Sequence, residues 1–408
     1  MAAVPGYISA FMLDRGLPAA VISVILAVNL LFSFLGSLFW GRRIDITQNH
    51  RAHFLMGIAS FFVLNLAIYP LGSYPLAMGA LYAAHGFLVG FGATCLDSWV
   101  LASCPGNSSL GARARTFATL SYAATMLATG LLIGRMGYIV IMAIMIGMLG
   151  ICGIVALNTP RAEGMAGMAP AGRSGLSAAD LKQLLGNREW TLLLVMAFFT
   201  GLAIAPINNL KAVILERVGG DTATLGLDSF IGCMVQAPFL FFSATIRRMN
   251  RKLRLVISTL SPLLYVLLVC TAAAPAMIIL GTICQNISFG IFYPTMREIT
   301  EDCVPAKLRT TAHSVIDVSY GSLTGVMAMA ASGVLLTAFG LQTMVLLSFA
   351  VQLLPFGVAM YNLVSRNPQP AAAPRTAESQ KKKTKPVLQN AHSACPQNGF
   401  LRGLKKGC

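Results

Sequence analysis

Long apolar segments constrain the fold of this 408-residue chain more than any other feature. A helix that crosses a bilayer needs about 20 mostly apolar residues, and only helices or closed barrels satisfy their backbone groups in lipid. The segments are too long and too uniformly apolar for barrel strands, so we expect a polytopic, all-α membrane protein. They lie near 17–40, 53–73, 76–104, 116–134, 137–157, 190–215, 223–246, 253–273, 275–297, 310–338 and 340–363.

Charge is scarce and unevenly placed. The chain is 56% hydrophobic and 11% charged, whereas soluble domains carry about 25% charged residues. Its net charge of +16 could suggest a nucleic-acid partner, but the basic residues gather in alternate loops. This is the positive-inside pattern, so we expect no nucleic-acid partner. It predicts a multi-pass protein of the cytoplasmic (cell inner) membrane with a cytoplasmic C-terminus.

The same alternation makes Asp14–Gly16 an external loop, so a membrane span must precede it. Residues 1–13 are apolar, but as a helix they reach only about 20 Å, short of a bilayer core. No basic region or cleavage site marks a signal peptide. We therefore expect a truncated first helix, unless the natural start lies upstream of Met1.

The chain divides into four parts by composition. We expect an N-terminal helix bundle over 1–157, a cytoplasmic middle loop over 158–188, a C-terminal bundle over 189–364 and a basic disordered tail over 365–408. The halves echo each other: Arg115 leads to Gly130 and Gly137, and Arg309 leads to Gly333 and Gly340. Transporters are often built from such repeats, with the substrate site at their interface.

Polar side chains inside the spans mark a candidate site, because ionisable groups in lipid are costly and usually face a cavity. Asp97 ends one span and Arg115 begins the next, so the two can pair and offer acceptors and donors to vicinal hydroxyls. Tyr122 lies two turns beyond Arg115 and could stack on a sugar ring. The plainer alternatives are an Asp97 that reaches water and a Tyr122 that only packs.

Three further ionisable groups have open roles. Asp317 lies one or two turns inside a helix and His313 lies four residues earlier on the same face. Either could carry a coupling proton, or Asp317 could simply bond a neighbouring Ser or Tyr. Lys211 could pair with Glu216 or reach the outer surface.

An inner loop holds small and charged residues that could form a cytoplasmic gate. Gly41, Asp45 and Arg51 lie in the first basic loop, and Arg113 lies in the next; a plain charged loop is the alternative. No CxxC, HExxH, GxSxG or His/Cys cluster occurs. We therefore expect no metal site, no cofactor and no enzymatic activity.

Several stretches resemble known transporters. The spacing of Gly41 and Asp45 is similar to the helix 2–3 loop of the major facilitator superfamily, although Ile46 and Gln48 depart from that pattern. The stretches 86–97 and 112–117 resemble lactose permease and the related oligosaccharide–proton symporters. Their spacing of 18 from Asp97 to Arg115 equals the family's spacing between its sugar-binding acid and arginine.

This resemblance implies a bundle of 12 helices, the first one truncated, in two pseudo-symmetric six-helix halves. It further implies that Tyr122 replaces a stacking Trp, and that Asn209 and Gln236 fall at cavity-facing positions. The family's proton relay is absent. Its places hold Cys233, Tyr265, Cys284 and Ile287.

From these features we expect a monomeric secondary transporter that moves a small polar solute, a sugar or oligosaccharide, with proton symport. A nucleoside, aromatic acid or drug, and a uniport mechanism, remain as alternatives. So does a sensor derived from a transporter.

Overall fold

The computed structural model describes residues 3–47, 49–103, 108–159, 178–305 and 308–365. The chain separates into a unit over Met1–Val364 and a second unit over Ser365–Cys408. All the described helices belong to the first unit. Ten of them are long and apolar enough to cross a membrane, which confirms the polytopic helical fold for the described residues.

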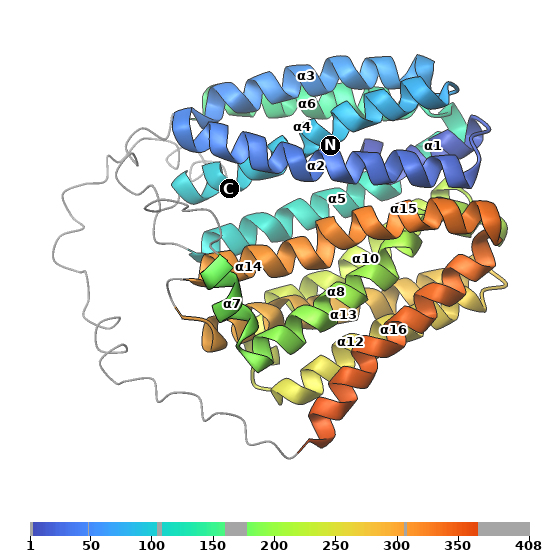
Figure 1. Cartoon of the computed structure of the whole chain (residues 1–408). Helices are drawn as coiled ribbons and strands as arrows, with labels where there is room; N and C mark the ends of the chain where they lie inside the picture. Colours follow the sequence, from blue (N-terminus) through green and yellow to red (C-terminus); the bar gives the residue numbers. More distant parts are fainter. Residues whose placement is uncertain (1–2, 48, 104–107, 160–177, 306–307, 366–408) are drawn as a thin grey trace, which may run out of the picture. The chain divides into compact units, whose positions relative to one another are not determined.

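Six helices form the first half (Figure 1). The helix α1 covers only 12 residues, whereas α2, α4 and α5 each run for 29. Their bounds are α1 Ala3–Asp14, α2 Ala19–Thr47, α3 His50–Leu71, α4 Pro75–Ser103, α5 Ser108–Met136 and α6 Ile139–Asn158.

The second half begins after a short helix inside the predicted middle loop, α7 (Ala178–Leu185). Two of its spans are interrupted. Leu210 separates α8 from α9, and a π-helical turn, η2, joins α14 to α15. The bounds are α8 Arg188–Asn209, α9 Lys211–Arg217, α10 Thr222–Phe241, α11 Ser243–Ile246, α12 Arg251–Cys270, α13 Pro275–Cys303, α14 Arg309–Asp317, η2 Val318–Ser322, α15 Leu323–Ala338 and α16 Gly340–Val364.

The packing of these helices is two-fold symmetric. Counting each interrupted span once, the second helix of each half packs on the fifth helix of the other: α2 on α15, and α10 on α5. Within the halves, α2–α4 corresponds to α10–α13, and α3–α6 corresponds to α12–α16. Gly137 and Gly340 both have positive φ, at 71° and 79°, where the last two spans of each half meet. The predicted bundle of two pseudo-symmetric halves is confirmed.

One detail of the predicted repeat is wrong. Arg309 is the first residue of α14, but α5 begins at Ser108, seven residues before Arg115. The two arginines are therefore not equivalent, although the glycines that follow them are. A spanning helix needs apolar side chains only where it lies in the bilayer, so it can continue into polar sequence outside the bilayer.

Small residues bring neighbouring helices into backbone contact. On α4, Gly86 and Gly90 face α2 so closely that a Cβ at either would lie 2.2 Å from a main-chain oxygen. This is the small-xxx-small packing of membrane helices. Across the halves, a Cβ at Gly226 of α10 would lie 2.7 Å from the oxygen of Met126 on α5. We call this crossing of α5 and α10 the glycine seam.

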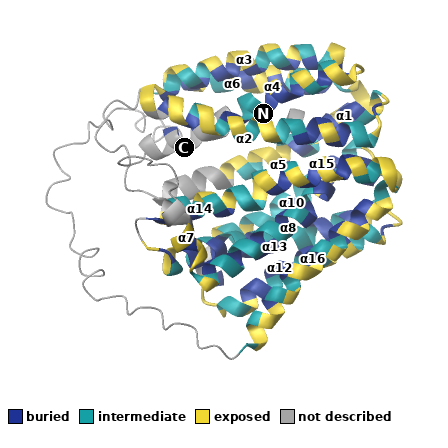
Figure 2. Cartoon of the chain, viewed as in Figure 1, coloured by how far each residue is buried: buried dark blue, intermediate teal, exposed yellow. Residues whose placement is uncertain are grey.

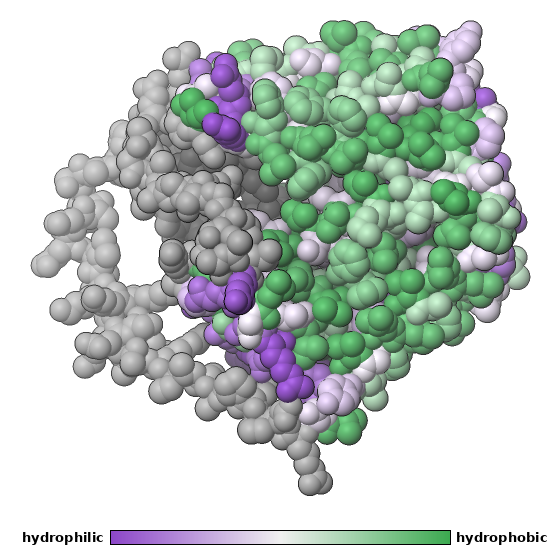
Figure 3. Space-filling view, in the orientation of Figure 1, coloured by the Kyte–Doolittle hydropathy of each residue, from purple (hydrophilic) through white to green (hydrophobic). Residues whose placement is uncertain are grey.

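The outward faces of the helices are exposed and apolar. Exposed residues follow the outer surfaces of helices such as α3 and α16 (Figure 2), and they include Leu38, Val63 and Ile154. Apolar side chains cover most of the visible surface, and hydrophilic ones gather around α7 at one end (Figure 3). A continuous exposed apolar surface of this kind suits a lipid environment.

Candidate functional site

A polar cavity of about 510 Å³ lies between the two halves. Helices α1, α2, α4 and α5 line one side, and α8, α9, α10 and α13 line the other. Its polar lining is rich in amides and hydroxyls: Ser9, Asn29, Ser33, Tyr122, Asn208, Asn209, Lys211, Asp228, Ser229, Gln236, Thr282, Gln285 and Asn286. Tyr122, Asn209 and Gln236, predicted from the sequence as substrate contacts, all line this cavity.

A buried ion pair forms the charged part of the lining. The ammonium of Lys211 donates to Asp228 Oδ2 at 2.8 Å and to Thr282 Oγ1 at 3.0 Å. The side chain of Asp228 is 0% exposed, and that of Lys211 is 12% exposed. Oδ1 of Asp228 is buried without a hydrogen-bond partner. The pair therefore has one satisfied carboxylate oxygen and one that is free to accept.

The structure corrects the predicted partner of Lys211, which is Asp228 and not Glu216. Asp228 is not among the polar residues singled out from the sequence. The same signal, an acid inside an apolar span, would have found it. Lys211 is the first residue of α9, directly after the break at Leu210, so the interruption of this span lies beside the pair.

A tyrosine holds the pair from the side of α12. The hydroxyl of Tyr265 donates to Asn208 Oδ1 at 3.0 Å, and its ring centroid lies 5.6 Å from Lys211 Nζ. Tyr265 stands where the resembling family has part of its proton relay. In this chain that position contributes a cation–π contact to the lysine of the cavity.

Asp97 and Arg115 lie in helices that flank the interface, at the 23rd residue of α4 and the eighth of α5. Their side chains, like those of Asp45 and Arg113, are outside the described part of the structure. Helix α2 extends to Thr47, so Gly41 and Asp45 lie in its last turns and not in the loop predicted there. Arg51 in α3 donates to the carbonyl of Leu157 at 2.5 Å.

Asp317 is less buried than the sequence suggests. Its side chain is 44% exposed, and Oδ2 accepts from Arg297 Nη2 at 2.5 Å. Arg297 also donates to the hydroxyl of Tyr293 at 2.9 Å. Asp317 ends α14 directly before the π-helical turn, and neither it nor the half-buried His313 lines the central cavity.

A second buried ion pair lies at the ends of α12 and α13. Arg254 is 1% exposed and meets Glu298 through two bonds, Nη1–Oε2 at 2.9 Å and Nη2–Oε1 at 2.8 Å. Thr295 accepts a further bond from Arg254 at 3.2 Å, and Arg251 contacts Glu298 at 3.3 Å. None of these residues lines the central cavity.

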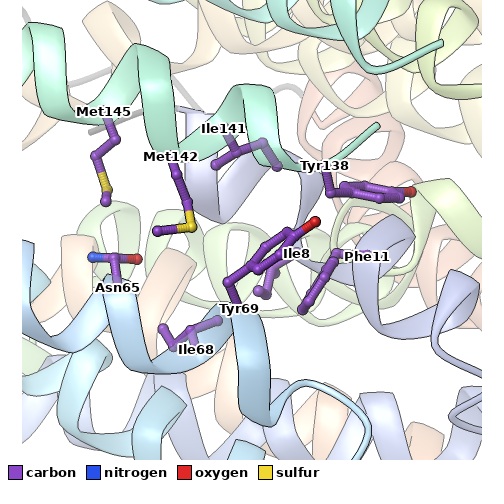
Figure 4. Close-up of a pocket in the computed structure, with 9 residues that line it drawn as sticks. All are labelled: Ile8, Phe11, Asn65, Ile68, Tyr69, Tyr138, Ile141, Met142 and Met145. Carbon is purple, nitrogen blue, oxygen red and sulfur yellow. The ribbon is translucent and has the colours of Figure 1, made fainter. Parts of the chain in front are cut away.

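Two other cavities adjoin the first half. A cavity of about 490 Å³, lined among others by Arg15, Glu216 and Asp221, shares Ala212 and Leu225 with the central one. It lies at the predicted outer side. A small aromatic pocket between α1, α3 and α6 is too small for a solute, at about 30 Å³. Figure 4 shows its lining: Ile8, Phe11, Asn65, Ile68, Tyr69, Tyr138, Ile141, Met142 and Met145.

A two-fold helical bundle with a central polar cavity is the architecture of multi-pass membrane transporters. Residues 1–349 match the model of the MFS_1 like family, and the chain belongs to this family of the major facilitator superfamily.

Individual proteins are similar to this chain at low identity. The maltose permease of Geobacillus stearothermophilus is 25% identical over 205 residues, which cover 48% of this chain and 49% of the permease. The match thus spans about half the length of that relative. The nucleoside transporter NupG, in a mutant form, superposes with a TM-score of 0.74 at 15% identity, over 88% of this chain and 95% of that one. The D-xylose-proton symporter gives 0.65 at 13% identity, over 88% and 94%. At these identities both superpositions show a shared fold and nothing more.

Proposed function

We propose that this transporter moves a small neutral solute with many hydroxyl groups, a sugar, across the cytoplasmic membrane together with a proton. The observation that carries the proposal is the composition of the central cavity. Amides and hydroxyls line it, and the two charged side chains among its described lining residues, Lys211 and Asp228, neutralise each other. Such a lining offers many donors and acceptors but no net charge, which suits a neutral sugar better than an ion.

In this proposal Tyr122 stacks on the sugar, Asn209 and Gln236 bond its hydroxyls, and Asp97 and Arg115 bind vicinal hydroxyls as a pair. The repeat supports the pairing. Arg297 is the 23rd residue of α13, as Asp97 is of α4, and Asp317 is the ninth residue of α14, as Arg115 is the eighth of α5. Arg297 and Asp317 are an ion pair, with the two charges exchanged between the helices.

The mechanism that follows is alternating access, in which the two halves rock about the central cavity. We also propose that the C-terminus and the 158–188 segment lie in the cytoplasm, with Gly41, Asp45, Arg51 and Arg113 at the inner gate. The alternating basic loops support this orientation. The pathway is complete within one chain, so we propose a monomer.

A nucleoside is the second candidate. The fold superposes on a nucleoside transporter with a TM-score of 0.74, and the rings of Tyr82 and Tyr122 line the cavity. A base could stack on either ring while its ribose uses the same amides. The maltose permease and the D-xylose-proton symporter favour the sugar.

Counterflow in proteoliposomes tests the proposal. Vesicles that contain the purified chain are loaded with an unlabelled sugar or nucleoside. Entry of labelled maltose, xylose, uridine or adenosine into these vesicles is then followed. We expect sugar entry and none of the nucleosides. Uptake of nucleosides alone would replace the first candidate with the second.

Two substitutions then test the proposed contacts. Arg115→Lys should abolish sugar exchange, because an ammonium cannot reproduce the two-pronged donor of a guanidinium. Tyr122→Ala should weaken sugar binding about threefold to tenfold, the size of a single aromatic contact, while Tyr122→Phe keeps the ring and retains binding. An Arg115→Lys protein with full exchange contradicts the hydroxyl-binding role.

A further inference from the structure

We propose that Lys211 and Asp228 form the proton-coupling site: Asp228 takes up the proton, and Lys211 is the cation that this proton releases for contact with the solute. The inference rests on the proposed function, since it assigns the coupling step to a site within the same cavity. It assigns that step to residues with no counterpart in the relay of the resembling family.

The free carboxylate oxygen is the first observation. Among the described residues, Asp228 is the one fully buried carboxylate, and it lines the central cavity. Lys211 occupies Oδ2, whereas Oδ1 has no partner. A buried acceptor without a donor is costly, so Oδ1 is positioned to receive one. A proton that enters the cavity with water supplies it by forming an O–H bond there.

The charge balance supplies the coupling. With Asp228 ionised, the pair is neutral and the empty carrier can reorient. When Oδ1 binds a proton from water, Asp228 becomes neutral and the largely buried Lys211 is left as an uncompensated cation, which is unfavourable. Solute hydroxyls can accept hydrogen bonds from Lys211 and so stabilise it. On the other side the solute leaves, the O–H bond breaks, the proton returns to water and the ion pair reforms.

The other ionisable groups that face the pair are two phenols and a thiol. Those that face it are Tyr265 from α12, Tyr122 from α5 and Cys233 from α10, with Thr282 from α13 as a neutral acceptor. Phenols and thiols ordinarily lose their protons above about pH 8. On α9 itself, Glu216 and Arg217 are exposed and lie beyond the pair. Among the described groups of the pair and those that face it, Asp228 is the one carboxylate, and it is the group to which we assign the proton.

The position of Lys211 offers a way for proton binding to act on the helix. It begins α9 directly after the break at Leu210, so a change in its bonding acts at the point where this span is interrupted. Interrupted helices at the midplane are where transporters place their coupling ions. By contrast, Asp317 is 44% exposed, remains paired with Arg297 and lies off the cavity.

The experiment measures protons and solute together. The full chain is reconstituted with a pH-sensitive dye inside the vesicles. Acidification of the lumen after addition of maltose or xylose is then compared with entry of the labelled sugar. We expect Asp228→Asn to lower the ratio of protons to solute from that of the wild type to near zero. Glu301→Gln, an exposed acid on α13, is the matched control and keeps the ratio. Asp317→Asn tests the competing site and should keep it too.

Infrared titration reads the same carboxyl without any solute. A carboxylic-acid C=O band that appears on acidification should be present in the wild type and missing in Asp228→Asn, even in a variant that does not transport. A wild-type proton ratio or an unchanged band in Asp228→Asn overturns the inference, as does loss of coupling in Asp317→Asn alone. Sugar exchange without proton movement in the wild type overturns the inference but leaves the proposed function standing. Absence of exchange for every sugar contradicts the proposed function, and the infrared band still decides the role of Asp228.

Discussion

The two buried ion pairs of the second half differ in how their charged groups are bonded, although each leaves one buried polar atom without a hydrogen-bond partner, Nε of Arg254 and Oδ1 of Asp228. Arg254 and Glu298 meet through two parallel bonds, with Thr295 and Arg251 as further partners. Lys211 and Asp228 meet through one bond, and one carboxylate oxygen has no partner. The first pair is packed between helices, whereas the second faces a cavity.

This difference separates a structural role from a functional one. Bidentate arginine–carboxylate pairs fix geometry, and removing one partner leaves an uncompensated charge with no access to water. A lysine–carboxylate pair beside a cavity can break, bind a proton or a solute, and reform. Four substitutions test whether the two pairs behave in these ways.

The largest effect is expected from Glu298→Ala. It leaves the guanidinium of Arg254, 1% exposed, without a counter-ion, and such changes cost about 3–5 kcal/mol. Thermal unfolding followed by tryptophan fluorescence in detergent measures the loss, and Trp190 is fully buried in this half. The double variant Arg254→Met with Glu298→Leu should recover most of it. A melting temperature for Glu298→Ala within a degree of wild type would contradict a structural role.

Lys211→Gln should cost less, about 1–3 kcal/mol, the range for a buried acceptor that loses its partner. The cavity lets water or a proton replace the ammonium, which the packed site of Arg254 does not. Adding Asp228→Asn should restore stability, because the double variant leaves no charge in the cavity. The same melting assay checks this. If Lys211→Gln is as destabilising as Glu298→Ala, the two sites are not different in kind.

The solvent-exposed carboxylate of Asp221 gives a reference for the stability effects expected at the two buried pairs. Asp221 caps α10, accepting from the Thr224 amide at 2.8 Å and its hydroxyl at 2.6 Å, and these bonds hold the pKa of Asp221 below its ordinary value. Asp221→Ala should cost about 1 kcal/mol at neutral pH. Because the folded-state pKa is lowered, this stabilisation is present at neutral pH and is lost as the pH falls through the pKa of the folded state. Wild type and variant should therefore melt closer together in acid, and a gap that widens there would contradict the cap.

The smallest effect is expected from Tyr265→Phe. It keeps the ring beside Lys211 and removes the hydroxyl, which bonds Asn208 and also interacts with Lys211. The amide of Asn208 remains exposed to the cavity. The cost should be about 0.5 kcal/mol, at the low end for one hydrogen bond. Tyr265→Leu removes the cation–π contact as well and should cost more. Equal melting temperatures for the two variants would show that the ring does not hold the lysine.

Among the described residues, the apolar segments predicted the order of the spans but not where each helix begins and ends. Helix α2 continues through polar residues as far as Thr47, and α5 already begins at Ser108. Hydropathy marks the part of a helix that lies in lipid and not the whole helix. Tyr122, Asn209 and Gln236 could be placed in the cavity, since each is polar and at a position implied by the family resemblance.

The ion pair of the cavity could not be predicted in the same way. Nearness in sequence suggested Glu216 for Lys211, yet five residues turn a helix by about 140°, so the two side chains diverge. The true partner, Asp228, lies on the next helix, and contacts between helices depend on a packing that single-sequence patterns do not contain. The burial of Asp317 was misjudged for the same reason, because Arg297 approaches it from α13.

The glycine seam has a consequence for turnover. Where Gly226 crosses α5, it lies against the carbonyl oxygen of Met126, the Cα of Leu127 and one side-chain atom, the hydroxyl of Tyr7. Tyr7 is bonded to the oxygen of Met126 within the same half. Parting and rejoining this contact therefore orders few rotamers and avoids much of the entropy cost that interlocked side chains would impose. The two spans that meet there, α5 and α10, can then separate and close quickly, because few side chains interlock between them. A slower counterflow rate in Gly226→Ala would show that the absence of a side chain at this crossing contributes to the speed of the carrier.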